Sequence, residues 1–183
     1  MWKNIYSLVV QLITAPSNAW MRIKEEGETL NFFTKHFLHP VFGIISLASF
    51  IGGLWFSKSG NIENALKMVI VNLISVYGGY YIAAYILNEI APRYGLAQNI
   101  SRFSIFTGYS SVVIYLIFML SAFFPNFFII WVLAIYTVVL INAGTIYYLD
   151  IAEQHRANFS LISSAIVMFV PIIINQIFRF MVK

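Results

Sequence analysis

Long apolar stretches separated by short polar segments make up most of this chain. A transmembrane helix needs about 20 apolar residues. Five stretches approach or reach that length, at residues 41–56, 65–90, 104–124, 127–149 and 159–182. Only Pro125 and Asn126 separate the third stretch from the fourth, which predicts a tight hairpin between antiparallel neighbours. The pattern therefore predicts five membrane-spanning helices, the first beginning after Pro40.

The residues before the first apolar stretch follow a different pattern. Apolar residues recur here at helical spacing, and polar residues form the opposite stripe, which predicts an amphipathic helix in the plane of the membrane interface. A signal peptide is the alternative, but Gln11 interrupts the apolar run. A second helix, with Pro16 in its first turn and Trp20 within it, is expected to be solvated or interfacial. Residues 1–38 are thus predicted to form an interfacial segment that precedes a transmembrane domain of residues 39–183.

Composition supports an all-α integral membrane protein. Hydrophobic residues make up 60% of the chain and charged residues only 10%, against about 25% charged residues in soluble domains. The net charge is +4, without the clustered basic face that nucleic-acid binding requires. We therefore expect membrane lipids and other membrane proteins, or further copies of the chain, as partners, and no nucleic acid.

The distribution of lysine and arginine predicts the orientation of the chain. Loops on the cytoplasmic side carry an excess of these residues. If five helices span the membrane, seven lie on the side of the N-terminus and four on the other: Lys3, Arg22, Lys24, Lys35, Arg93, Arg102 and Arg156 against Lys58, Lys67, Arg179 and Lys183. This bias predicts a cytoplasmic N-terminus and an external C-terminus.

Polar side chains within the apolar stretches are candidates for function. Tyr77, Tyr80, Asn142 and Asn175 lie inside the predicted helices, where polar groups either bond neighbouring helices or line a pathway. Packing and bonding between helices is one interpretation, and a groove for a lipid or ligand is the other. Ser75, Gly79 and Ala83 are spaced four apart, which predicts a face for close helix approach.

Catalytic chemistry has little support in the sequence. The chain has no cysteine, which excludes thiolate ligands and a cysteine nucleophile, and no known catalytic motif occurs. Carboxylates and imidazoles that could bind a metal together lie in the predicted cytoplasmic segments: His36, His39, Asp150, Glu153 and His155. A solvated loop is the more common role for such residues. We therefore expect neither a cofactor, a metal nor an enzymatic activity.

The segment "FTGYSS" places small and hydroxyl-bearing residues inside the third apolar stretch. Gly108 would admit a neighbouring helix or loop, and the Tyr109 hydroxyl would reach a backbone group or a lipid phosphate. Ser110 and Ser111 would bond to carbonyls of the preceding turn and bend the helix. Alternatively, Gly108, Tyr109 and Ser110 form a contact site for a lipid headgroup or a partner.

These motifs resemble those of the YIP family, the Ypt/Rab-interacting membrane proteins, and in particular its small bacterial members. The similar residues are Pro16 and Trp20 in "TAPSNAW", Gly95 in the loop before the third stretch, and Gly108 and Tyr109. The sequence departs from the family where valines follow the Gly-Tyr element instead of the proline that members often have. It also lacks the long acidic and proline-rich head of eukaryotic members, which is tied to trafficking.

The resemblance implies a non-enzymatic protein of the bacterial inner membrane that organises the membrane or its proteins. A lipid-handling protein, either a scramblase or a lipid carrier, is an alternative from a different class. Two further alternatives are an accessory subunit of a transporter and a membrane-embedded metalloenzyme.

Overall fold

The fold was analysed in a computed structural model, which describes residues 2–55, 60–124 and 128–182. All regular structure within these residues is helical. Three helices form an N-terminal layer, defined here as residues 2–33: α1 (Trp2–Thr14), α2 (Pro16–Glu26) and α3 (Leu30–Phe33). The others form an elongated bundle: α4 (His39–Trp55), α5 (Ile62–Ile90), α6 (Ile100–Ser110), α7 (Val112–Phe123), α8 (Tyr136–Tyr147) and α9 (Glu153–Met181).

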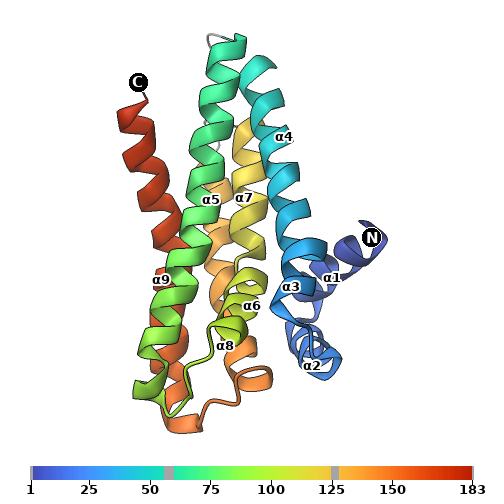
Figure 1. Cartoon of the computed structure of the whole chain (residues 1–183), viewed down its shortest axis with the longest axis vertical. Helices are drawn as coiled ribbons and strands as arrows, with labels where there is room; N and C mark the ends of the chain where they lie inside the picture. The colour runs from blue at the N-terminus through green and yellow to red at the C-terminus, as the bar shows by residue number, and fades with distance from the viewer. Residues whose placement is uncertain (1, 56–59, 125–127, 183) are drawn as a thin grey trace.

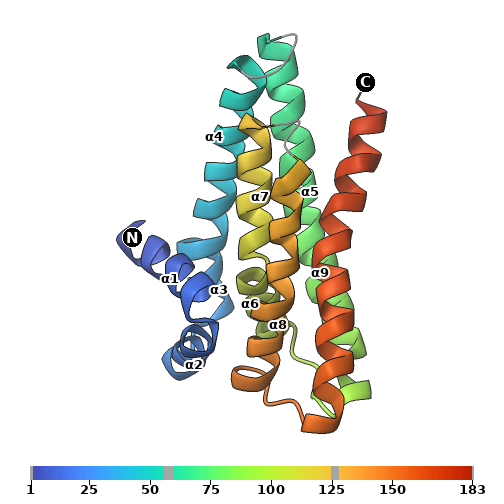
Figure 2. The ribbon, with the colours of Figure 1, turned by 180° about the vertical axis from the view of Figure 1, so that it is seen from behind.

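The bundle helices run up and down along a common axis (Figure 1). Consecutive long helices are antiparallel, and the C-terminus lies at the end opposite to α2 and to the loops that precede α6 and α9. Seen from behind, α8 lies between α7 and α9, while α1 projects sideways from the bundle (Figure 2). The N-terminal layer therefore lies against the side of the bundle, towards the end opposite the C-terminus.

The predicted second and fifth membrane helices are confirmed as α5 and α9. The predicted start of the first was wrong, because one continuous helical run extends from Leu30 to Trp55. It includes the π-helical turn η1 (Thr34–Leu38) just before Pro40. Proline has no N–H to donate to the carbonyl four residues earlier. A wider turn at this point changes the hydrogen-bond register and lets the helix continue through Pro40.

The five predicted membrane helices are confirmed only in part. Three described helices are individually long and apolar enough to cross a membrane: Leu30–Trp55, Ile62–Tyr94 and Glu153–Met181. The predicted third helix is bent by 46° between α6 and α7, and it adds a fourth span if the bent pair is counted as one. The predicted fourth comprises the 3-10 segment η3 (Phe128–Ile135) and the short helix α8. The hairpin at Pro125 and Asn126 lies outside the described residues.

Ser111 lies at the bend between α6 and α7. Its hydroxyl donates to the Thr107 carbonyl at 2.7 Å, the interaction expected of a serine that bends a helix. The Ser110 hydroxyl, predicted to do the same, is buried and has no hydrogen-bond partner among the described residues. Only one of the two serines therefore bonds the preceding turn.

Small residues bring the bundle helices together. An added Cβ at Gly79 would lie 2.6 Å from Pro171, so α5 and α9 meet at this pair. Ser75 and Ala83, on the same face of α5, are buried as well. The predicted face for close helix approach is confirmed. At the other end of α5, Gly53 of α4 packs against the Ala65 backbone. Such contacts let helices associate closely where lipid supplies no hydrophobic driving force between them.

Candidate functional site

Trp20 fastens the N-terminal layer to the bundle. Its side chain is fully buried, and its indole N–H donates to the Leu140 carbonyl of α8 at 2.9 Å. The ring packs beside Phe106 and against Gly144, where an added Cβ would lie 2.8 Å from the indole. A helix expected to be solvated or interfacial thus inserts its largest side chain into the bundle, because Gly144 leaves room for it.

Gly108 and Tyr109 form a second contact with the N-terminal layer. The Phe33 ring lies directly on Gly108, so that an added Cβ would overlap it. The Phe33 and Tyr109 rings meet edge to face, with centroids 4.9 Å apart. The Tyr109 hydroxyl donates to the Glu28 carboxylate at 2.6 Å. Gly108 thus admits a neighbour as predicted. The Tyr109 hydroxyl, predicted to reach a backbone group or a lipid phosphate, instead donates to a carboxylate.

Burial and charge set the properties of Glu28. Burial of this half-buried carboxyl group raises its pKa above the ordinary value of 4.5, while the hydrogen bond from Tyr109 opposes that rise. Glu26 raises the pKa further, and Arg22 and His36 lower it. Glu28 therefore holds a proton more readily than an exposed glutamate.

The other family-motif residues have local structural roles. Pro16 is the first residue of α2, where its missing N–H would have no helical partner in any case. Gly95 has a φ of 73° and ends η2 (Ala91–Tyr94), donating its N–H to Pro92. That left-handed conformation favours glycine.

The carboxylates and histidines considered for metal binding are dispersed. Asp150 pairs with Lys24 at 2.6 Å and lies 3.5 Å from Arg102. His36 stacks on Phe32, and His155 packs against Tyr94. Within the described residues, no group of three His, Asp or Glu side chains is placed to hold a metal ion. These side chains, together with His39 and Glu153, therefore do not form the composite site that the sequence allowed.

Amide side chains bond three helices together in the interior of the bundle. Asn175 of α9 donates to the Asn72 side-chain oxygen at 3.0 Å and to the Ser75 hydroxyl at 3.1 Å. Asn72 of α5 donates in turn to the Ser49 hydroxyl of α4 at 2.8 Å. All four side chains are buried. Asn175 therefore takes part in a chain of hydrogen bonds between helices, which we call the amide network.

The remaining candidates lie apart from that network. Tyr80 is buried, and its ring lies near those of Phe33 and Phe42. Tyr77 packs edge to face on Phe42, with centroids 4.3 Å apart. Asn142 is exposed on α8. The four residues proposed to line one groove thus occupy three different environments.

Sequence reasoning missed the bundle residues that receive Trp20 and the acid that receives Tyr109. Gly144 lies within the last turn of an apolar helix, where glycine lowers helix stability. A glycine at such a position could have indicated that another side chain approaches closely. Glu28 is the last of three closely spaced glutamates before the helical run that begins at Leu30, and nothing in the sequence distinguishes it from the other two. The Leu140 carbonyl could not have been predicted as the acceptor for Trp20, because every helical residue carries a backbone carbonyl.

The amino-acid sequence was also compared with known proteins. A family model described as the Yip1 domain matches residues 10–174, which is most of the chain. The matched range contains both contacts between the N-terminal layer and the bundle. The chain has no significant match among curated proteins or among solved structures. The protein is therefore an integral membrane protein that belongs to the Yip1 domain family.

Proposed function

We propose that this protein organises other membrane proteins without catalysing a reaction, and that the outer face of α2 is the surface on which they dock. The observation that carries the proposal is that Trp20 and Phe33 hold the N-terminal layer in a fixed position against the bundle. Trp20 and Ile23 are buried against the bundle, while Arg22, Lys24 and Glu25 on the same helix are exposed. This rigid helix face carries exposed side chains of both positive and negative charge. Such a surface suits binding to the polar segments that flank the membrane helices of another protein.

The interior of the bundle supports this role better than transport or catalysis. The amide network uses the polar groups of Asn72 and Asn175 to join helices. Asp150, one of the acids considered for metal binding, is paired with Lys24. Partners are therefore expected to be other membrane proteins or further copies of the chain.

Photo-crosslinking in intact cells tests the docking surface. A photoreactive residue in place of Glu25 is expected to give discrete protein adducts, whereas one in place of Tyr85, an exposed residue of α5, is expected to give lipid adducts only. Adducts at Glu25 that contain only lipid would overturn the docking proposal. Turnover by the purified protein that depends on Asp150, Glu153 or His155 would overturn the non-enzymatic role.

We also propose that the N-terminal layer lies in the cytoplasm of a bacterial cell and that the C-terminus lies outside the inner membrane. The excess of lysine and arginine at the end that carries α2 supports this orientation. Because the chain has no cysteine, single cysteines at Glu25 and Phe180 can be labelled individually. A membrane-impermeant maleimide should label only the Phe180 position in intact cells, and labelling of Glu25 would reverse the orientation.

A further inference from the structure

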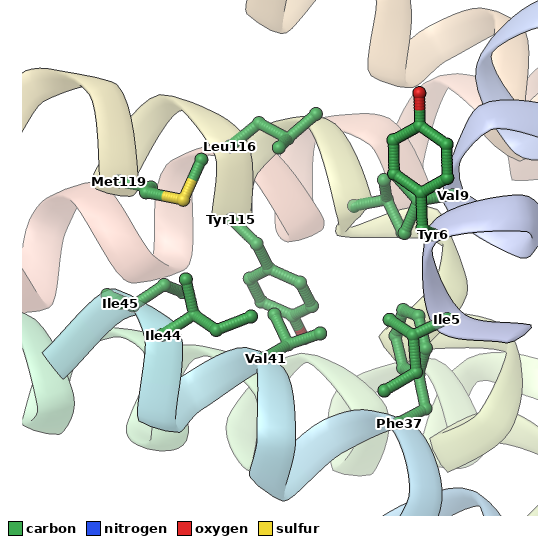
Figure 3. A pocket seen from close by; sticks show the side chains of 11 residues that line it. Ile5, Tyr6, Val9, Phe37, Val41, Ile44, Ile45, Tyr115, Leu116 and Met119 are labelled. Atoms are coloured by element: carbon green, nitrogen blue, oxygen red, sulfur yellow. The ribbon is translucent and has the colours of Figure 1, made fainter. Parts of the chain in front are cut away.

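An apolar groove opens between α1, α4 and α7. Its volume is about 290 Å³, and its lining is hydrophobic apart from the two tyrosine hydroxyls. Phe37 and Ile5 lie at one end, and Met119 lies at the other (Figure 3). Val41, Ile44 and Ile45 form the wall from α4. The groove thus follows the membrane-spanning helix for about two turns, or roughly 12 Å.

A polar pocket adjoins the groove at its Ile5 end. The two share Ile5 and Phe37 in their walls, and the polar pocket has a volume of about 230 Å³. Its charged and polar lining consists of Arg22, Glu26, Glu28, His36 and Tyr109. An apolar groove that runs along a membrane helix and ends in a charged pocket matches the shape of an amphiphile.

The charges in the polar pocket select among amphiphiles. Arg22 is paired with Glu26 at 2.7 Å, and Glu28 adds a second carboxylate. The lining thus carries two glutamates and one arginine, so an anionic headgroup finds no surplus of positive charge there. A headgroup that carries a phosphate and an ammonium group finds partners of both signs.

We infer that groove and pocket together bind one phospholipid with a phosphoethanolamine headgroup. The headgroup-proximal part of one of the two acyl chains lies in the groove, the phosphate faces Arg22, and the ammonium group donates to Glu26 and Glu28. A choline headgroup has the same net charge but no N–H to donate, so it binds less tightly. The lipid bridges the N-terminal layer and the bundle, a role beyond the docking of protein partners.

Native mass spectrometry of the purified full-length chain tests the headgroup. The delipidated protein is mixed with equal amounts of phosphatidylethanolamine, phosphatidylcholine and phosphatidylglycerol that share the same acyl chains. The expected result is one retained phosphatidylethanolamine per chain, favoured about threefold or more over either competitor, as one charge-assisted hydrogen bond predicts. Equal retention of all three lipids, or preference for phosphatidylglycerol, would overturn the inference.

A matched pair of variants tests the place of the acyl chain. Ile44→Phe fills the groove and should abolish the preferential retention. Leu133→Phe fills a second apolar groove, between Ile13, α7 and η3, which shares Leu116 and Met119 with the first but has no ionisable lining other than a tyrosine. Because Leu133 lines only the second groove, this change should leave retention unchanged. Both native side chains are exposed, so neither change disturbs the core. Equal effects of the two variants would contradict the assignment.

A third variant tests the ammonium contact. Glu26→Gln should reduce the preference for phosphatidylethanolamine over phosphatidylcholine without weakening the binding of phosphatidylcholine, because Arg22 remains to face the phosphate. A loss of both lipids, or no change in the preference, would count against the contact. Because these measurements contain only protein and lipid, their failure leaves the docking of protein partners at α2 untouched.

Discussion

Two regions of this molecule hold helices together by different means. Where the N-terminal layer meets the bundle, aromatic side chains fill spaces left by glycines: Trp20 lies against Gly144, and Phe33 against Gly108. In the bundle interior, between α4, α5 and α9, amide and hydroxyl groups bond one another. The first contact is specified by shape and the second by hydrogen bonding. We therefore expect changes of side-chain volume at the contact with the N-terminal layer to lower the free energy of unfolding strongly. Loss of a polar side chain in the bundle interior should lower it only mildly.

The largest expected effect comes from Trp20→Ala. Truncating a fully buried tryptophan leaves a cavity and removes its hydrogen bond to Leu140, so unfolding should become easier by about 3–5 kcal/mol. Unfolding in mixed micelles, followed by circular dichroism, measures the change. Trp55→Ala is the matched control, because Trp55 is 71% exposed and should contribute less than about 0.5 kcal/mol. Equal costs for the two variants would show that the layer is not locked by Trp20.

Gly108→Ala should have the next largest effect. The new methyl group would overlap the Phe33 ring, and overpacking of this kind costs about 1–3 kcal/mol. Gly43→Ala is the matched control, because nothing lies within 4 Å of an added Cβ there and alanine favours a helix over glycine by about 0.5–1 kcal/mol. The same unfolding assay should therefore give opposite signs. A neutral Gly108→Ala variant would mean that Phe33 moves aside freely.

Asn175→Ala should cost less than either change in the layer. Hydrogen bonds between membrane helices contribute about 0.6 kcal/mol each and at most about 1.7 kcal/mol. Gln176→Ala, at the exposed neighbouring position, should be neutral. A double-mutant cycle with Asn72→Ala measures the coupling directly. A cost above that of Trp20→Ala would invert the comparison between the two regions.

The smallest expected effect is the pH dependence contributed by Glu28. Because burial raises its folded-state pKa, the folded chain binds this proton more tightly than the unfolded chain. Protonation of Glu28 should therefore stabilise the folded chain fully below the ordinary pKa of 4.5. This contribution should be lost as the pH rises through the higher folded-state pKa. Glu28→Gln should remove this part of the pH dependence, while Glu25→Gln at an exposed position should keep it. Identical pH profiles for both variants would contradict the assignment.

The spans and motifs differ in how far the sequence predicted them. α5 was predicted within three residues of its boundaries and α9 within six, because their apolar runs are long and contain few charges. The run that begins at Leu30 was predicted to start eleven residues later. Pro40 normally marks a helix start, and the π-helical turn that accommodates it leaves no periodic signal. The Gly-Tyr element was identified as a motif, but its contacts with Phe33 and Glu28 were not.

Hydrophobic periodicity alone determined that this chain is a helical membrane protein with an amphipathic N-terminal segment, because a long apolar helix is stable only in a bilayer or a core. Its short motifs were sufficient to place it in a family. Only the tertiary structure decided that the N-terminal segment packs onto the bundle, that Asn72 bonds Asn175 across 103 residues, and that Asp150 pairs with Lys24 rather than joining a metal site. Those choices depend on which helix faces meet, and a one-dimensional pattern shows which side chains need a partner without showing which partner lies opposite.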